Sequence, residues 1–189
     1  MRSHTVEDSP LGLLTLVEED AALAGLYMVD QRHLPDPARH GERDDDVLPQ
    51  LREQLDAYWS GSLQEFTVPL RTTGTPFQVR VWAALTTIPY GETWSYGKLA
   101  AEIGQPTASR AVGLANGKNP VGIVVPCHRV VGSSGSLTGY GGGLERKRWL
   151  LDHELAMRWR ASSPQAVSTT AANTTITSML TPQTPEEPV

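Results

Sequence analysis

A shortage of cysteine is the first feature of this 189-residue sequence, which contains only one, Cys127. A single thiol excludes a disulfide framework and a zinc site built on several cysteines, and it is typical of a reducing compartment. No apolar run approaches the roughly 20 residues that a membrane-spanning helix needs, and the N-terminus lacks the apolar segment of a signal peptide. We therefore expect a soluble, cytoplasmic protein that does not bind a membrane.

Positive charge is scarce over the whole chain, but it is unevenly distributed. The formal net charge of −5 argues against a nucleic-acid partner if the charge is spread evenly. Residues 1–74 hold 6 Lys/Arg against 14 Asp/Glu, whereas residues 75–160 hold 10 against 5. A basic segment within an acidic protein is what a localised phosphate-binding surface needs, although ordinary surface variation can give the same split.

The first 74 residues have the pattern of a small α/β domain. Two apolar runs between residues 3 and 29, separated by turn residues, predict strands. The charged, proline-containing segment 31–46 predicts a loop. Apolar residues at helical spacing from Val47 predict a helix that ends at Gly61, and residues 66–70 could return as a strand. No catalytic constellation is evident in this part. Its histidines, which lack convincing metal-ligand spacing, are His4, His33 and His40.

A boundary at residues 72–76 leads into a mostly helical domain, residues 75–160. The apolar face from Phe77 to Ile88 predicts its first helix. The last helix is outlined by Leu144, Leu151 and Leu155. Beyond it, residues 161–189 are rich in Ser, Thr and Pro and contain no aromatic residue. This composition predicts a disordered tail without a catalytic role.

Two short helices in the middle of this domain predict a helix-turn-helix. Ser95 is suited to cap a helix that runs to Ile103, and Thr107 is suited to cap the next helix, residues 108–116. The connection contains Gly-Gln-Pro, which favours a tight turn. Packing between helices alone remains possible for this pattern, but it does not account for the arginine near the start of the second helix, Arg110.

Cys127 lies in the segment 123–130, Ile-Val-Val-Pro-Cys-His-Arg-Val. A thiolate is a strong nucleophile, and its formation depends on a lowered thiol pKa, which the neighbouring imidazole of His128 and guanidinium of Arg129 both favour. The apolar residues before it predict a buried, strand-like approach that Pro126 ends. A lone cysteine is more often a small buried hydrophobe. The Cys-His-Arg sequence beside a proline favours a reactive thiol here.

Four blocks in order carry a resemblance to a known family. They are Arg110-Ala-Val-Gly, Asn116-Gly-Lys-Asn-Pro-Val121, Pro126-Cys-His-Arg-Val130 and Gly139-Tyr-Gly-Gly-Gly-Leu144. Together they resemble the O6-alkylguanine-DNA alkyltransferases, closely from about Thr75 to Glu154 and weakly before that. The resemblance implies a ribonuclease-H-like α/β N-terminal domain, followed by a mostly helical, winged helix-turn-helix-like domain.

The resemblance also implies a reaction and its residues. Cys127 accepts the alkyl group of O6-alkylguanine and, less well, of O4-alkylthymine. His128 activates the thiol through a water molecule, and Glu154 orients His128, which is the logic of nucleophile, base and orienting group. The thioether product is stable, so each molecule acts once. Taken alone, Glu154 would be interpreted as an exposed helix carboxylate.

The same resemblance assigns the contacts to DNA. The damaged base is rotated out of the duplex, Arg110 fills the space that it leaves, and Tyr96 crowds the phosphate and lines the pocket. Thr107 and Ser109 belong to the same DNA-binding group. The pocket is completed by Val130, Tyr140 and Gly141. Asn119 is implied as a structural hinge between the helix-turn-helix and the active-site segment.

No cofactor or metal is expected, because the cysteines that form a structural zinc site in some family members are absent. The partner implied is alkylated double-stranded DNA, bound by a monomer that could assemble cooperatively. Two other classes remain open from the residues alone. A helix-turn-helix regulator or lesion-binding module would not need Cys127, and a cysteine hydrolase would leave Arg110 unexplained.

Overall fold

The structure is a computed structural model that describes residues 1–162 of the chain. The predicted tail, residues 161–189, lies outside the described residues except for its first two. No helix in the described part is long and apolar enough to cross a membrane.

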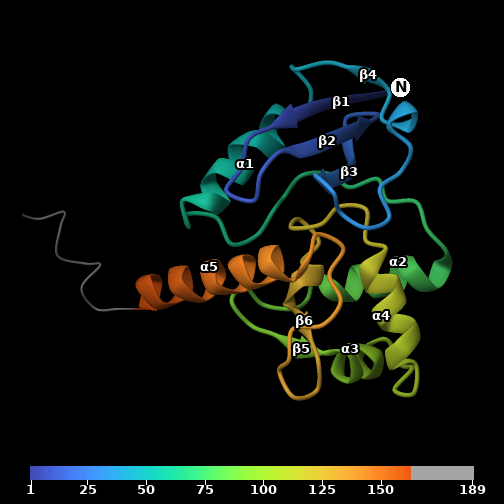
Figure 1. Cartoon of the computed structure of the whole chain (residues 1–189), viewed down its shortest axis with the longest axis vertical. Helices are drawn as coiled ribbons and strands as arrows, with labels where there is room; N and C mark the ends of the chain where they lie inside the picture. The colour runs from blue at the N-terminus through green and yellow to red at the C-terminus, as the bar shows by residue number, and fades with distance from the viewer. Residues whose placement is uncertain (163–189) are drawn as a thin grey trace, which may run out of the picture.

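The N-terminal domain is a four-stranded sheet with one helix beside it (Figure 1). Its strands are β1 (Arg2–Glu7), β2 (Leu14–Glu19), β3 (Ala22–Met28) and β4 (Glu42–Arg43), in the order β3-β2-β1-β4. β1 and β3 are antiparallel to β2, and the short β4 is parallel to β1. The tight turn between β2 and β3 has positive φ angles at Asp20 and Ala21, as two-residue hairpin turns require. The predicted small sheet with a helix is therefore present.

The helix α1 (Pro49–Trp59) contributes Leu51, Leu55 and Tyr58 to the core. Two expectations for this domain need correction. The expected loop 31–46 contains β4 and a short 3-10 helix, η1 (Pro37–Arg39). Residues 66–70 do not form a strand, because only Leu70 makes a single bridge, to Leu23.

The C-terminal domain is built from four α-helices, one 3-10 helix and two very short strands (Figure 1). These are α2 (Pro76–Leu85), β5 (Trp94–Ser95), α3 (Tyr96–Glu102), α4 (Ser109–Gly117), the 3-10 helix η2 (Cys127–Arg129), β6 (Val130–Val131) and α5 (Leu144–Ser162). β5 and β6 pair in parallel, so the start of α3 lies beside the segment that follows Cys127. The predicted pair of short helices is present as α3 and α4.

The two short helices differ in how they begin. The Ser95 hydroxyl accepts a hydrogen bond from the Lys98 amide at 3.0 Å, so it caps α3 as predicted. The prediction that Thr107 caps α4 is wrong: α4 begins after Ala108, and no side chain caps it. The chain at residues 105–108 instead forms a backbone turn, in which the Ala108 amide donates to the carbonyl of Gln105.

This difference leads to a matched prediction about stability. Ser95→Ala should lower the free energy of unfolding by about 1 kcal/mol, the usual value of an N-cap hydrogen bond. Thr107→Ala should leave it within a few tenths of a kcal/mol, because no cap bond is lost. Urea unfolding of both variants checks this, and an equal loss for both would contradict the assignment of the caps.

The buried face of α5 is not the one that the leucine spacing predicted. Leu144 and Leu155 are 47% and 60% exposed, whereas Lys147, Leu150 and Glu154 are fully buried. Charged residues occupy the inner face because each has polar partners inside the protein. A pattern of apolar residues cannot reveal such a face.

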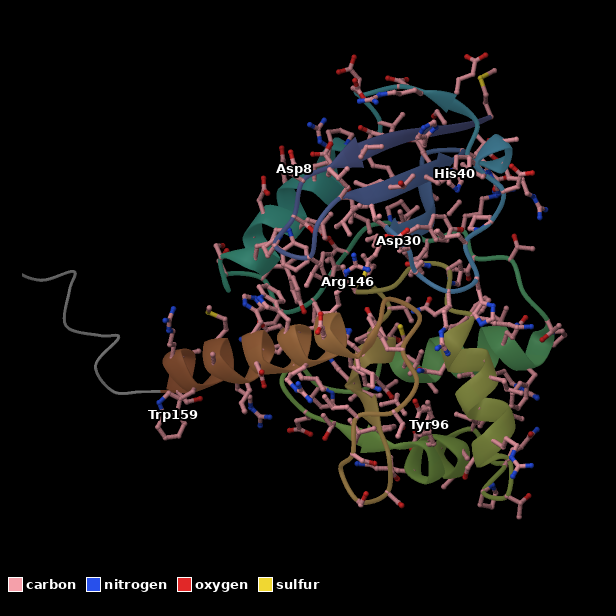
Figure 2. The ribbon with its side chains drawn as sticks, viewed as in Figure 1. Asp8, Asp30, His40, Tyr96, Arg146 and Trp159 are labelled. Atoms are coloured by element: carbon pink, nitrogen blue, oxygen red, sulfur yellow. The ribbon has the colours of Figure 1, made fainter. Side chains whose placement is uncertain are left out.

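The two domains share one hydrophobic core and several polar contacts. The Leu26 amide in β3 donates to the Pro120 carbonyl, and the Arg32 amide donates to the Gly141 carbonyl, both at 2.8 Å. From α5, the Arg146 guanidinium donates to the carbonyls of Leu11 and Val29 at 3.0 and 2.7 Å. Figure 2 shows Arg146 between the sheet and the C-terminal domain. The N-terminal domain therefore braces the loop that leads into α5.

Candidate active site

Cys127 begins η2 and is 6% exposed. The approach to it is buried, but it is a series of turns and not the strand-like segment that was expected: Ile123 has a φ of 72°, and the Val125 amide donates to the Val121 carbonyl. The Asn119 side chain holds these turns, accepting from the Val121 amide and donating to the Val125 carbonyl at 2.8 Å. This contact links the end of α4 to the residues just before the thiol.

His128 and Glu154 lie together in the interior, and both are fully buried. The Nε2 atom of His128 is 2.9 Å from Oε1 of Glu154. Although burial alone would raise the pKa of Glu154, hydrogen bonds from His128 and Arg129 and the positive charge of Arg129 hold it well below its ordinary value of 4.5. An ionised carboxylate only accepts hydrogen bonds, so Nε2 carries the proton and Nδ1 keeps a lone pair.

The Nδ1 atom of His128 is buried and has no hydrogen-bond partner within residues 1–162. Burial lowers the pKa of His128, opposed by the neighbouring Glu154, so the imidazole is neutral near pH 7. A neutral ring with a free lone pair at Nδ1 is able to accept a proton. This is the property that a general base requires.

The sequence predicts that Arg129 stabilises the thiolate, but the structure shows a different role. Its Nε and Nη2 atoms donate to the two oxygens of Glu154 at 2.9 and 3.0 Å, and Nη1 donates to the Ile88 carbonyl at 2.6 Å. The guanidinium is therefore a buried partner of the carboxylate. Glu154 also accepts from the Tyr58 hydroxyl at 2.8 Å and from the Gly91 amide at 3.0 Å.

The positive charge that acts on the thiol comes from Lys147, which the sequence analysis did not single out. Burial raises the pKa of the Cys127 thiol above its ordinary value of 9.0, while the Asn119 side chain and the Lys147 charge oppose this rise. Lys147 is fully buried, donates to the carbonyls of Val130 and Thr138 at 2.6 and 2.7 Å, and has its pKa lowered by burial to about 8. The unreacted thiol is thus protonated near neutral pH, and its reaction needs a base.

The predicted pocket residues gather around the loop before α5. The Tyr96 hydroxyl, at the start of α3, donates to the carbonyls of Thr138 and Gly139 at 3.1 and 3.3 Å. Figure 2 places Tyr96 in the lower part of the C-terminal domain, on the side away from the sheet. Tyr140 is buried. Burial, together with the nearby Cys127, raises the pKa of the Tyr140 hydroxyl well above its ordinary value of 10.0. Gly141 is the residue whose carbonyl accepts from the Arg32 amide.

The predicted DNA-contacting residues lie at the start of α4. Arg110 is exposed, and its guanidinium has no hydrogen bond or ion pair with another residue of the described chain. Thr107 is also exposed, and Ser109 is partly buried, with its hydroxyl oxygen facing Gly97 of α3. A solvent-exposed guanidinium without a partner in the protein is available to a ligand.

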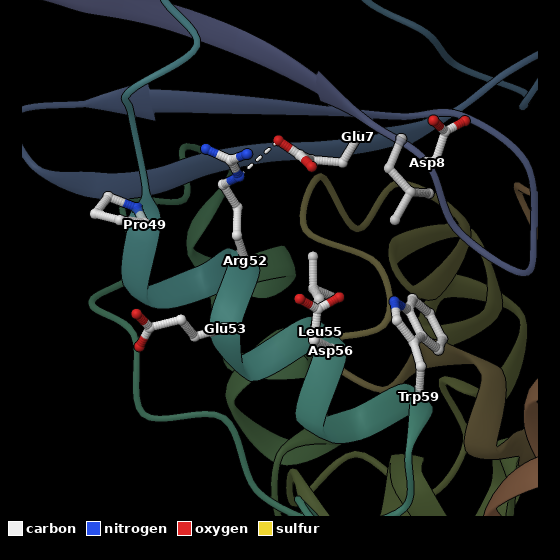
Figure 3. Close-up of a pocket in the computed structure, with 9 residues that line it drawn as sticks. Glu7, Asp8, Pro49, Arg52, Glu53, Leu55, Asp56 and Trp59 are labelled. Atoms are coloured by element: carbon white, nitrogen blue, oxygen red, sulfur yellow. Dashed lines mark ion pairs between the residues drawn. The ribbon is translucent and has the colours of Figure 1, made fainter.

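A cavity of about 280 Å³ lies far from these residues, between α1 and the β1–β2 end of the sheet (Figure 3). Four carboxylates line it, those of Glu7, Asp8, Glu53 and Asp56. Only Glu7 has an ion pair there, with Arg52 at 2.7 Å. This acidic surface would repel a phosphate backbone. Within residues 1–162, no cluster of three or more His, Cys, Asp or Glu side chains is suited to a metal ion.

Comparison with known proteins identifies the family. Residues 3–72 match the ribonuclease-like domain of 6-O-methylguanine DNA methyltransferases, and residues 76–156 match the DNA-binding domain of the same family. The chain belongs to the 6-O-methylguanine DNA methyltransferase family. The family resemblance of the four sequence blocks is thereby confirmed.

Curated relatives and solved structures agree. A methylated-DNA–protein-cysteine methyltransferase of Mycolicibacterium paratuberculosis is 56% identical over 152 residues, covering 80% of this chain and 91% of the relative. One from Methanosarcina acetivorans is 44% identical over 152 residues, covering 80% and 97%. The crystal structure of Mycobacterium tuberculosis OGT in complex with DNA superposes with a TM-score of 0.79 at 52% identity, covering 82% of this chain and 94% of that one.

Three residues of the site were missed by the sequence analysis. Lys147 is close to the Gly-Gly-Gly-Leu block, but nothing in a hydropathy pattern distinguishes it from its exposed neighbour Arg148. Asn116, within the second block, donates to the Cys127 carbonyl at 3.3 Å. Tyr58 lies in the other domain, 96 residues before Glu154, and no local pattern signals that contact.

Proposed function

We propose that this protein repairs DNA by taking an alkyl group from O6-alkylguanine, and less readily from O4-alkylthymine, onto Cys127. The observation that carries the proposal is the buried relay, in which an ionised Glu154 fixes the proton on Nε2 of His128 and leaves Nδ1 free, in the residue that directly follows the single cysteine. The relatives, named methylated-DNA–protein-cysteine methyltransferases, support it.

The reaction requires no cofactor. The thiol proton passes, through a water molecule, to Nδ1 of His128, and the thiolate of Cys127 attacks the alkyl carbon. A carbon–sulfur bond forms while the carbon–O6 bond breaks, and its electron pair goes to the base. A proton then restores neutral guanine, so the thiol proton is balanced by the one that guanine gains. The thioether has no base or second thiol to remove it, so each molecule reacts once.

The damaged base must leave the stack for this geometry to be reached, and the start of α4 is suited to that step. Arg110 projects there without a partner in the described chain, and its planar guanidinium can stack and hydrogen-bond in the vacated space. Tyr96 would promote the rotation at the pocket, with Thr107 and Ser109 beside the backbone. In this proposal α3 and α4 act as the helix-turn-helix of a winged domain.

The loop that Tyr96 and Lys147 hold would cover the flipped base. Tyr140 and the Gly141 backbone would contact the guanine. The Val130 carbonyl accepts from Lys147 and retains a second lone pair for the exocyclic amine. Asn119 would keep the thiol segment in register with α4 through its bond to Val125. The partner is alkylated double-stranded DNA, bound by a monomer that can assemble cooperatively.

The exposed charges of the C-terminal domain are compatible with DNA binding. Of the basic residues in the C-terminal domain, Arg129 and Lys147 are buried, and Arg146 binds backbone carbonyls. The exposed ones that remain to attract phosphate in this domain include Arg80, Lys98, Arg110 and Lys118. The surplus of positive charge counted in residues 75–160 is therefore larger than the positive charge that is available to DNA. The available charge is still positive.

The variant Cys127→Ser tests the proposal. It should bind alkylated duplex DNA with an affinity within about twofold of the unchanged protein, because phosphate and wedge contacts are untouched. It should transfer no alkyl group, since a hydroxyl beside a neutral imidazole is a far weaker nucleophile than a thiolate. Gel-shift titration and a labelled-methyl transfer assay measure the two properties. Residual transfer in Cys127→Ser would place the acceptor elsewhere.

A further inference from the structure

Tyr58, in the N-terminal domain, reaches the catalytic carboxylate of the C-terminal domain. It lies on the last turn of α1, its side chain is completely buried, and its hydroxyl donates to Oε1 of Glu154 at 2.8 Å. Oε1 is the same oxygen that faces Nε2 of His128. The hydroxyl thus acts at the atom that orients the base.

Contacts of both the ring and the backbone of Tyr58 hold its hydrogen bond to Glu154 in place. The Tyr58 ring packs between Trp59, Phe66 and Tyr90, with ring centroids 5.0, 5.3 and 6.0 Å away. Its backbone carbonyl lies 2.9 Å from Nε2 of His153, on the same helix as Glu154. Because ring and backbone are both held, the hydroxyl keeps its place relative to α5 and fixes the position of Oε1.

Glu154 has five donors, divided unevenly between its oxygens. Oε1 accepts from Tyr58, His128 and Arg129, whereas Oε2 accepts from Arg129 and the Gly91 amide. Arg129 binds both oxygens and therefore tolerates small rotations of the carboxyl group. Tyr58 binds only Oε1 and the Gly91 amide binds only Oε2, so together they select the rotation in which Oε1 points to His128.

We infer that Tyr58 is a positioning residue of the alkyl-transfer relay, which makes the N-terminal domain part of the catalytic apparatus. This inference rests on the proposed function. Tyr58 does not touch the substrate: it fixes Oε1 so that His128 keeps its proton on Nε2 and its lone pair on Nδ1. It also shares the negative charge of the carboxylate, which sets how strongly His128 attracts a second proton.

Loss of the hydroxyl has a definite direction of effect on pH dependence. Without this donor, Glu154 presents more negative charge to His128, so the imidazolium form becomes easier to make and the inactive, protonated relay persists to higher pH. Other groups face the pair and are unchanged by this substitution. They are Arg129 from η2, Lys147 from α5, Tyr90 from the segment after α2, and Cys127 and Tyr140 beside them.

The test compares Tyr58→Phe with Tyr90→Phe. Both variants keep the ring and lose one buried hydroxyl, but the Tyr90 hydroxyl has no hydrogen-bond partner within the described chain. Transfer rates from methylated duplex DNA are measured between pH 5 and 9, at a temperature where circular dichroism shows each variant folded. Tyr58→Phe should slow transfer at neutral pH by about tenfold and move the pH of half-maximal rate upward. Tyr90→Phe should match the unchanged protein in both respects.

A second readout does not depend on repair of DNA. Because Cys127 is the only cysteine, its reaction with iodoacetamide as a function of pH reports the relay directly. The same upward movement is expected for Tyr58→Phe, and it should disappear when Glu154→Gln is also present, since Tyr58 acts through that carboxylate.

Equal behaviour of the two phenylalanine variants would overturn the inference, as would a loss of melting temperature in Tyr58→Phe without movement of either pH profile. These outcomes are separate from failure of the proposed function. If the proposed function is wrong, the unchanged protein itself will transfer no alkyl group. The iodoacetamide profiles would still show whether Tyr58 controls the relay.

Discussion

Glu154→Gln should slow alkyl transfer at least about a hundredfold while the protein stays folded at neutral pH. The carboxylate accepts five hydrogen bonds, and an amide nitrogen can accept none of them. If the amide instead donates to His128, the ring takes the other tautomer, with its proton on Nδ1 and no lone pair left there to accept the thiol proton. The corresponding change in serine proteases costs about 10⁴ in rate through the wrong tautomer.

The same substitution should also cost stability, by about 3–5 kcal/mol, because it leaves the guanidinium of Arg129 buried without its counter-charge. The pKa of Glu154 in the folded protein lies well below its ordinary value of 4.5. Its stabilising contribution is therefore complete above about pH 4.5 and is lost as the pH falls below that value. Glu154→Gln should lack this component of acid destabilisation.

Glu145→Gln is the matched control, because Glu145 is an exposed glutamate in the first turn of the same helix. It should change the free energy of unfolding by less than about 0.5 kcal/mol and leave the transfer rate unaltered. Single-turnover rates and urea unfolding at several pH values measure these effects. A Glu154→Gln protein that transfers at the normal rate would show that His128 does not need the carboxylate.

Arg110→Ala should reduce the rate of transfer from duplex DNA by an order of magnitude or more. Extruding a base costs a few kcal/mol, and a gap left empty in the stack leaves much of that cost uncompensated. Arg110→Lys should also be substantially slower, because an ammonium can neither stack nor form a forked pair of hydrogen bonds. Transfer from free O6-benzylguanine, which needs no extrusion, should hardly change in either variant.

Lys118→Ala provides the comparison for a simple phosphate contact. Lys118 is an exposed cation that follows α4. If it binds phosphate, its loss should weaken binding similarly on all sequences and lower the salt slope by about one unit. Rates on duplex and free base, measured side by side, separate the two roles. Equal losses for Arg110→Ala on both substrates would show that Arg110 supports the fold or the active site and is not a wedge.

Local patterns predicted the elements whose cause is local. The strands before Val29, the helix that ends near Gly61 and the cap at Ser95 follow from periodicity and capping chemistry. The family resemblance correctly predicts that His128 and Glu154 lie together, at 2.9 Å. In each case the signal lay in a few neighbouring residues or in a long matched motif.

Predictions failed where the cause is tertiary. The inner face of α5 buries Lys147 and Glu154, and charged residues carry no apolar signal until their partners are known. Arg129 was predicted to stabilise the thiolate because it lies close to Cys127 in the sequence, but its guanidinium donates to Glu154 instead. The Tyr58 contact joins two domains across 96 residues of chain, beyond any local pattern.

The central claim, that Cys127 is the single-use acceptor, is tested most directly by the intact mass of the unchanged protein after incubation with excess O6-methylguanine duplex. We expect the whole population to gain one methyl group, located at Cys127 by peptide mapping, and the reaction to stop there. Sustained turnover with unmodified protein, or a methyl group on any other residue, would contradict the account.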